Sequence, residues 1–148
     1  MRVRRLLPVA GAATVVATLT VGAQAPGIRP IASIRQLHDA LITPASDALY
    51  AVGSEAPATD AAWTAVRNQA VVLAEAGNLL MLPGRAKDKG GWMKFSAAMA
   101  TAAARALRGA DTKNIDEVLK AGDEIAAICE ACHEPYRDGR RMGPPPAK

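Results

Sequence analysis

The chain has 148 residues, of which 50% are hydrophobic, and carries a formal net charge of +4 from 18 basic and 14 acidic residues. This length allows one domain. Only five residues are aromatic, and runs of β-branched residues are few, which favours helices packed closely through small side chains.

The first 25 residues have the pattern of a secretory signal peptide. Three arginines precede an apolar, uncharged stretch at 6–21, and a small-residue A-x-A cleavage site ends at Ala25. We expect cleavage after Ala25, or after Ala23 because Pro26 makes the later cut awkward. The alternative is an uncleaved anchor, but the stretch is shorter than the roughly 20 residues of a spanning helix. The mature chain is therefore predicted to be exported and to have no stable membrane span.

Most of the positive charge belongs to this leader. Removing residues 1–25 takes away three arginines and no acid, which leaves 15 basic and 14 acidic residues and a formal charge of +1. A nearly neutral chain without a basic cluster favours neither a nucleic-acid surface nor a polybasic membrane patch.

The first predicted helix runs from about residue 30 to Val52. Pro44 lacks a backbone donor, so we expect a kink or a break there. Apolar residues at spacings of three and four predict an inner stripe of Ile34, Leu37 and Leu41, and then Ala45 and Ala48. The second helix is expected to start at a cap, Thr59 or Asp60, and to extend to the Pro83-Gly84 terminator.

A polar loop is predicted at 85–91, followed by a third helix from Trp92 to Gly109. The fourth helix should start at Asn114, which is an N-cap residue, and end at Gly139. Four amphipathic segments with short connections predict an all-α, antiparallel four-helix bundle over residues 26–139, with a flexible C-terminal tail at 140–148.

The fourth helix carries the motif Cys129-Glu130-Ala131-Cys132-His133. Two cysteines three apart, followed at once by histidine, form the c-type haem attachment pattern, in which both sulfurs add to vinyl groups and the imidazole binds iron. On a helix the three side chains share one face. The sequence therefore predicts one covalent haem c in the bundle core, attached through Cys129 and Cys132, with His133 as axial iron ligand.

Two other interpretations of the cysteines remain open from the sequence. An exported protein could carry a CxxC dithiol or disulfide, although redox dithiols usually sit at a helix start in a βαβ context. A zinc site with Cys129, Cys132, His133 and His38 would also be chemically conceivable, but the adjacent Cys132 and His133 suit tetrahedral chelation poorly.

The run from Cys129 through His133 to Tyr136 and Arg137, placed in the last helix of an exported bundle, resembles the class II c-type cytochromes, the cytochrome c′ and c-556 group. The resemblance covers about residues 31 to 138, and Pro135 departs from the usual pattern. It implies a periplasmic location, covalent haem with the motif histidine as proximal ligand, and frequent homodimers.

The resemblance also implies that a methionine of the first helix fills the sixth iron position, or that an apolar residue leaves it open. Leu37 occupies the matching place, and no methionine lies between Met1 and Met81, so Leu37 is expected to cover the distal haem face. His38 is expected to be incidental, facing solvent, Asp39 or a propionate. The sixth iron ligand nevertheless stays open, because a slip of one residue in helix one would exchange Leu37 for His38, and Met99 is the best candidate among the methionines. Arg137, and less directly Arg35, are expected to pair with propionates.

The leading functional hypothesis is single-electron transfer with redox partner proteins, and no enzymatic activity is expected. The alternative is binding of NO or CO at an open iron over Leu37. Weak peroxidase-like chemistry would need a distal acid or base, for which only His38 is at hand.

Overall fold

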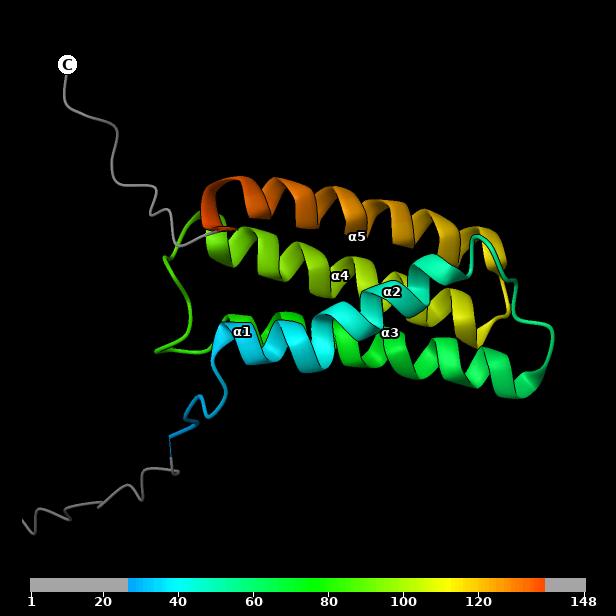
Figure 1. The fold of residues 1–148 in the computed structure, drawn as a ribbon, viewed down its shortest axis with the longest axis horizontal. Coiled ribbons are helices and arrows are strands. Elements are labelled where there is room, and N and C mark those ends of the chain that lie inside the picture. Colours follow the sequence, from blue (N-terminus) through cyan, green and yellow to red (C-terminus); the bar gives the residue numbers. More distant parts are fainter. Residues whose placement is uncertain (1–26, 138–148) are drawn as a thin grey trace, which may run out of the picture.

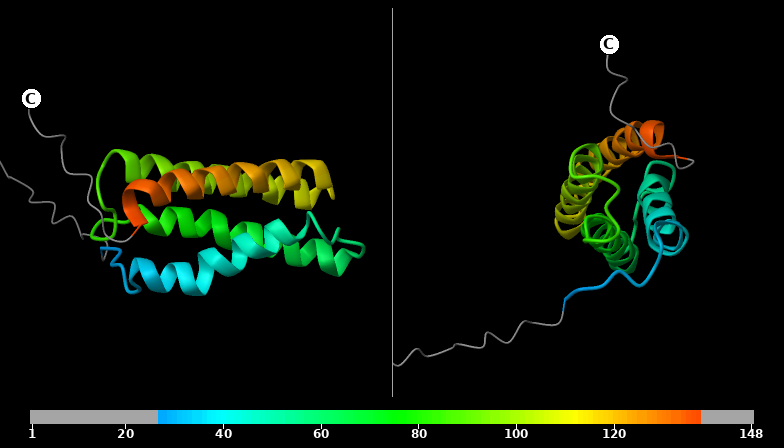
Figure 2. Two further views of the ribbon diagram at one scale, coloured as in Figure 1. Left: turned by 45° about the horizontal axis from the view of Figure 1, so that its top comes forward. Right: turned by 90° about the vertical axis from the view of Figure 1, so that its left-hand side faces the viewer.

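The computed structural model describes residues 27–137, so the predicted signal peptide at 1–25 and tail at 140–148 lie outside the described range. The helical elements are α1 (Ile34–Leu37), the π-helix η1 (His38–Ile42), α2 (Thr43–Ala51), α3 (Asp60–Leu80), α4 (Gly91–Asp111) and α5 (Ile115–Tyr136). The first three are continuous and together form helix one of the bundle. Four helical rods run alternately back and forth around one core (Figure 1; Figure 2, right). The predicted all-helical fold of four packed helices is confirmed, and within 27–137 there is no strand.

None of the described helices combines the length and the apolar character that crossing a membrane requires.

Helix one begins at Ser33, whose hydroxyl accepts a hydrogen bond from the Gln36 backbone at 3.2 Å. It then widens into the π turn η1 just before Pro44. Proline has no N–H, and its ring clashes with the carbonyl four residues back, here that of Ala40. The wider turn relieves this conflict, since the Thr43 N–H donates to the carbonyl of His38, five residues back. The predicted irregularity at Pro44 is thus confirmed, and it takes the form of a π turn without a break.

The π turn changes which residues of helix one face the core. An α-helical turn would follow Leu37 with Leu41 on the same face. The extra residue of the π turn puts Ile42 there instead, with 3% of its surface exposed, while Leu41 is only half-buried. The inner stripe predicted from a regular helix is therefore wrong at this position. The buried apolar residues of helix one are Leu37, Ile42, Ala45, Leu49 and Val52.

The predicted helix caps at Thr59 and Asn114 are confirmed. The Thr59 side chain accepts a hydrogen bond from the backbone of Ala62, and Asn114 accepts one from Glu117, both at 3.2 Å. Each satisfies one of the backbone donors that a helix start leaves free.

Gly109 does not end α4 as predicted, because the helix continues to Asp111. Its role is close packing: a Cβ at Gly109 would lie 3.0 Å from the Glu117 Cβ and 3.1 Å from the Val118 nitrogen. The left-handed residue that follows this helix is Lys113, with a φ of 53°. The predicted end of α5 at Gly139 falls outside the described residues, and α5 ends at Tyr136.

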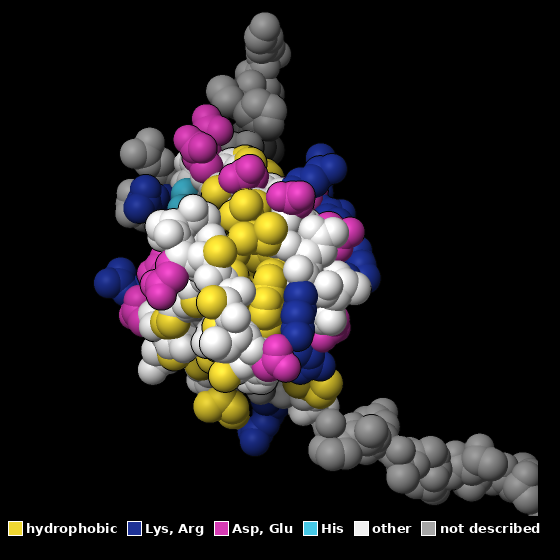
Figure 3. All heavy atoms as spheres, turned by 90° about the vertical axis from the view of Figure 1, so that its right-hand side faces the viewer, with side chains coloured by type: hydrophobic (Ala, Val, Ile, Leu, Met, Phe, Trp, Pro, Cys, Tyr) yellow, Lys and Arg dark blue, Asp and Glu magenta, His cyan; other side chains and the backbone are white. Residues whose placement is uncertain are grey.

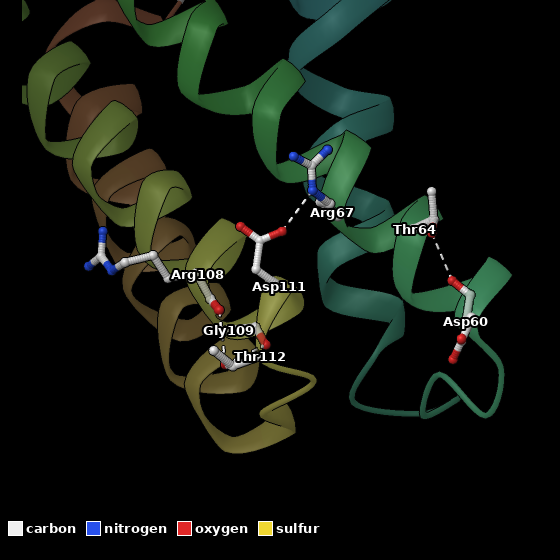
Figure 4. Close-up of polar contacts among 7 residues, drawn as sticks. All are labelled: Asp60, Thr64, Arg67, Arg108, Gly109, Asp111 and Thr112. Atoms are coloured by element: carbon white, nitrogen blue, oxygen red, sulfur yellow. Dashed lines mark hydrogen bonds and ion pairs between the residues drawn. The ribbon is translucent and has the colours of Figure 1, made fainter.

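The end of the bundle with the α2–α3 and α4–α5 connections is held by ion pairs. Arg67 of α3 reaches Asp111 of α4 at 2.7 Å (Figure 4), and Lys113 reaches Asp60 at 2.7 Å. In Figure 3, hydrophobic side chains gather in the middle of this end, and charged groups lie around them. These exposed pairs contribute little each, on the order of 1 kcal/mol or less.

Side-chain size changes along α4. Its first turns place Trp92, Phe95 and Met99 toward the interior, whereas the inner residues of its second half are Ala102, Ala103, Ala106 and Ala110. Small residues let neighbouring helices approach, and large ones hold them apart. The bundle is therefore tightly closed at one end and wider at the end where α4 begins.

Gly77 tests the close packing of α3 on the first half of α4. A Cβ there would lie 2.8 Å from the Ser96 carbonyl oxygen and 2.8 Å from the Ala100 Cβ. Overpacking costs about 1–3 kcal/mol, of which the better helix propensity of alanine offsets up to about 1 kcal/mol. We expect Gly77→Ala to lower the free energy of unfolding by about 1–2 kcal/mol in urea denaturation. Gly27→Ala, with nothing within 4 Å of the added Cβ, is the control. An unchanged urea midpoint for Gly77→Ala would contradict the described packing.

Candidate functional site

A cavity of about 570 Å³ opens at the wide end of the bundle, a size typical of cofactor and small-molecule sites. Its walls come from α1 and η1 on one side, from α4 and α5 on the other, and from Leu80 at the end of α3. In Figure 1 these segments all lie at the left-hand end of the bundle. The apolar part of the lining consists of Ile34, Ile42, Leu80, Trp92, Phe95, Met99 and Ile128.

The structure brings the three motif side chains of α5 to this cavity. Cys129, Cys132 and His133 all line it, as their spacing on one helix face predicted. Both cysteines are unpaired and half-buried. Burial raises the pKa of the Cys129 thiol, and burial together with the neighbouring Cys129 raises the pKa of Cys132 to about 11. Both sulfurs are therefore held as thiols at neutral pH.

His38 lines the opposite wall of the cavity and faces His133. The centres of the two imidazole rings are 5.9 Å apart, and the ring planes are inclined by 42°. Burial, and then the nearby His133, lower the pKa of His38. The resulting neutral imidazole is the form that binds metals. His38 therefore lines the same cavity as the motif residues of α5 and does not simply face solvent.

Leu37, expected to cover the distal face of a haem, does not line the cavity. It points into the core, with 5% of its surface exposed. Successive residues of a helix are rotated by about 100°, so Leu37 and His38 cannot face the same space. Helix one buries Leu37 among the other core residues and thereby turns His38 toward α5.

Three interactions fix the wall formed by α4 and the end of α5. The Trp92 indole N–H donates to the Leu80 carbonyl at 2.8 Å, which ties α4 to α3. The Tyr136 ring packs edge-on against Trp92, with centres 5.2 Å apart. Its hydroxyl donates to the Asp88 carboxylate, which also accepts from the backbone N–H groups of Gly90 and Trp92. Pro135 precedes Tyr136 inside α5, and these contacts anchor the turn that it weakens.

The cavity rim is basic. Arg35 and Arg137, both predicted to pair with propionates, line it, and Lys87 from the α3–α4 loop joins them. Arg35 also lies 3.5 Å from Asp39 on the exposed face of helix one. The rim can therefore offer cationic groups to a carboxylate at the cavity mouth.

Sequence reasoning missed the residues of the α3–α4 loop. Arg85 belongs to the segment predicted as a polar loop, yet only 8% of its surface is exposed. Its guanidinium donates to the carbonyls of Leu79 at 2.6 Å and Ala32 at 2.9 Å, which joins the loop to the chain preceding helix one. Lys87 and Asp88 reach the site from the same loop. No periodic pattern marks such residues. The one local signal is the spacing of Asp88 and Gly90, which is typical of a turn.

Zinc binding by the four residues considered above is not supported by their arrangement. A structural zinc site uses four ligands. Among residues 27–137, no three side chains of histidine, cysteine, aspartate or glutamate converge closely enough to hold a metal ion by themselves.

No family model, curated protein or solved structure matches this chain. The likeness to class II c-type cytochromes therefore depends on the motif residues and their context alone.

The contact of Tyr136 with Asp88 predicts a pH dependence of stability. The hydrogen bond from Tyr136 lowers the pKa of the Asp88 carboxyl. The charged form therefore stabilises the fold above the ordinary aspartate pKa of about 3.9, and this contribution is lost as the pH falls through the lowered value. We expect Tyr136→Phe and Asp88→Asn to be less stable than wild type at pH 7, with the difference shrinking in acid. Urea midpoints at both pH values measure this, and the exposed Asp123→Asn is the control. A difference that stays constant with pH would contradict the assignment.

Proposed function

We propose that this chain is a monohaem c-type cytochrome that transfers single electrons between redox partner proteins in the periplasm. The observation that supports this most is the convergence of Cys129, Cys132 and His133 on one apolar cavity of cofactor size. The proposal includes export by the predicted signal peptide and membership of the class II c-type cytochromes. Homodimer formation rests on the family resemblance only.

The cysteines would attach the haem covalently. Each thiol adds across one vinyl double bond, so that sulfur bonds to one carbon and the hydrogen ends on the other. No atom leaves, and the two additions involve no net oxidation. Cys129 and Cys132 suit this reaction because both are unpaired thiols on the cavity wall. Bound haem supplies a one-electron ferric–ferrous couple.

The remaining site residues have distinct tasks in this proposal. His133 would donate a ring nitrogen to the iron from α5. Trp92, Phe95 and the other apolar side chains exclude water, which keeps the site at low dielectric and affects the reduction potential. Arg137, Arg35 and Lys87 would neutralise the propionate carboxylates at the rim.

The same two cysteines fit the site of a thiol–disulfide oxidoreductase less well than they fit haem attachment. Redox dithiols depend on a lowered thiol pKa, commonly at a helix start. Here both thiols have raised pKa values, and they lie near the end of α5. Such thiols would be slow nucleophiles in exchange reactions.

The gas-binding alternative depended on Leu37 leaving an apolar, open iron face. Leu37 lies in the core and His38 occupies the cavity wall instead. Electron transfer is therefore the function that the arrangement favours.

The motif cysteines test the proposal directly. Full-length protein made together with the haem-attachment machinery should be coloured, give a positive pyridine haemochrome, and show the mass of the processed chain plus one haem. Cys129→Ala and Cys132→Ala should each retain haem through one thioether bond, with a shifted haemochrome band. The double variant should lose covalent haem altogether. Glu130→Ala, an exposed change between the two cysteines, should behave as wild type.

Colourless protein with two free thiols and a polypeptide-only mass would overturn this proposal. Haem that stays covalently bound in the double cysteine variant would also contradict it.

A further inference from the structure

We propose that His38 is the second axial ligand of the haem iron, so that His38 and His133 bind it from opposite sides. This inference rests on the proposed function, because it assigns a role toward the same cofactor. It differs from the two distal arrangements that the family resemblance implies, a methionine or an open position.

The separation of the two rings supports this assignment. A bond between a metal ion and an imidazole nitrogen is about 2 Å long, and the nitrogen lies about 1 Å from the ring centre. Two imidazoles on opposite sides of one ion therefore have their centres about 6 Å apart. The observed separation is 5.9 Å. The 42° between the ring planes is compatible, since each ring can rotate about its own metal–nitrogen bond.

The position of His38 is set by the backbone of helix one. His38 is the first residue of the π turn, and its carbonyl accepts the π-type hydrogen bond from Thr43. Single π turns inside helices occur frequently at functional sites. The preceding Leu37 is buried in the core, which anchors the helix at this point and orients the next side chain toward α5.

Helix one and α5 are otherwise well separated at this level. They pack against each other mainly through α2, beyond the π turn. Between α1–η1 and the end of α5 lies the cavity, with Ile34 and Ile42 flanking His38 on the helix-one side. The two histidines thus approach each other across a space with a largely apolar interior and a charged rim.

Three other side chains in the cavity could compete with His38, and one of them, the Tyr136 hydroxyl, is already bonded to Asp88. Met99 of α4 has a thioether that can bind haem iron, and 5% of its surface is exposed. Asp39 lies at the rim and pairs with Arg35, so its carboxylate already has a partner. Met99 is therefore the competitor that the experiment must distinguish.

Ligation by His38 closes both iron faces to small gases. The ferric and ferrous forms should both be six-coordinate and low-spin. The test uses full-length holoprotein, with electron paramagnetic resonance of the ferric form and optical spectra of the ferrous form with and without carbon monoxide. Wild type should be low-spin without the far-red band of a methionine-bound ferric haem, and carbon monoxide should leave its spectrum unchanged.

His38→Ala should convert the ferric spectrum to high-spin, and its ferrous form should bind carbon monoxide. Added imidazole should restore the low-spin spectrum. His38→Met should give the far-red band, because the side chain at this position lines the cavity opposite His133. Met99→Leu, which conserves volume, should match wild type.

Wild-type holoprotein that is high-spin, or that binds carbon monoxide as readily as His38→Ala, would reopen gas binding as the alternative to electron transfer. It would also overturn the ligand assignment, while covalent haem attachment would stand. If Met99→Leu loses the low-spin spectrum while His38→Ala keeps it, the ligand assignment is overturned and the proposed function stays intact. Protein without covalent haem would overturn the proposed function and this inference together.

Discussion

The π turn from His38 to Ile42 determines which side chains of helix one enter the core and which enter the cavity. Each residue added to a helix rotates the following side chains by about 100°. With one extra residue in this turn, Ile42 takes the core position that Leu41 would hold in a regular helix. Pro44 makes the wider turn favourable, because it can neither donate a hydrogen bond nor tolerate a close carbonyl one turn back.

The cavity lies at one end of the bundle because of the side-chain volumes on α4. Close-packed interiors leave few voids, so a large space needs a structural cause. The second half of α4 buries alanines against its neighbours, and Gly109 allows the backbone of α5 to approach there. The first half carries Trp92, Phe95 and Met99, which line the space without filling it. The motif of α5 meets this wider end because α5 runs antiparallel to α4 (Figure 1).

Local sequence signals predicted the helices and the shared face of the motif residues, because both depend on neighbours close in the chain. The caps at Thr59 and Asn114 and the shared face of Cys129, Cys132 and His133 are of this kind. Contacts between segments far apart in the chain could not be predicted from such local signals. The choice between Leu37 and His38 depends on a turn that no periodicity reveals. The bonds of Arg85 to Ala32 and of Tyr136 to Asp88 join residues 53 and 48 positions apart.

Ligation of one iron by His38 and His133 would also bear on the stability of the wide end. These residues lie near the two ends of the described chain, and a link between them would close a loop of nearly the whole domain. Cross-links of long loops restrict the unfolded chain most, and a bound metal stabilises the fold that provides its ligands. The polypeptide alone holds this part of helix one mainly through the packing of η1 on α3 and through the Arg85 bond to Ala32. The large side chains of α4 prevent direct packing between helix one and α5 at this end. A cofactor bound from both sides would join these two helices instead.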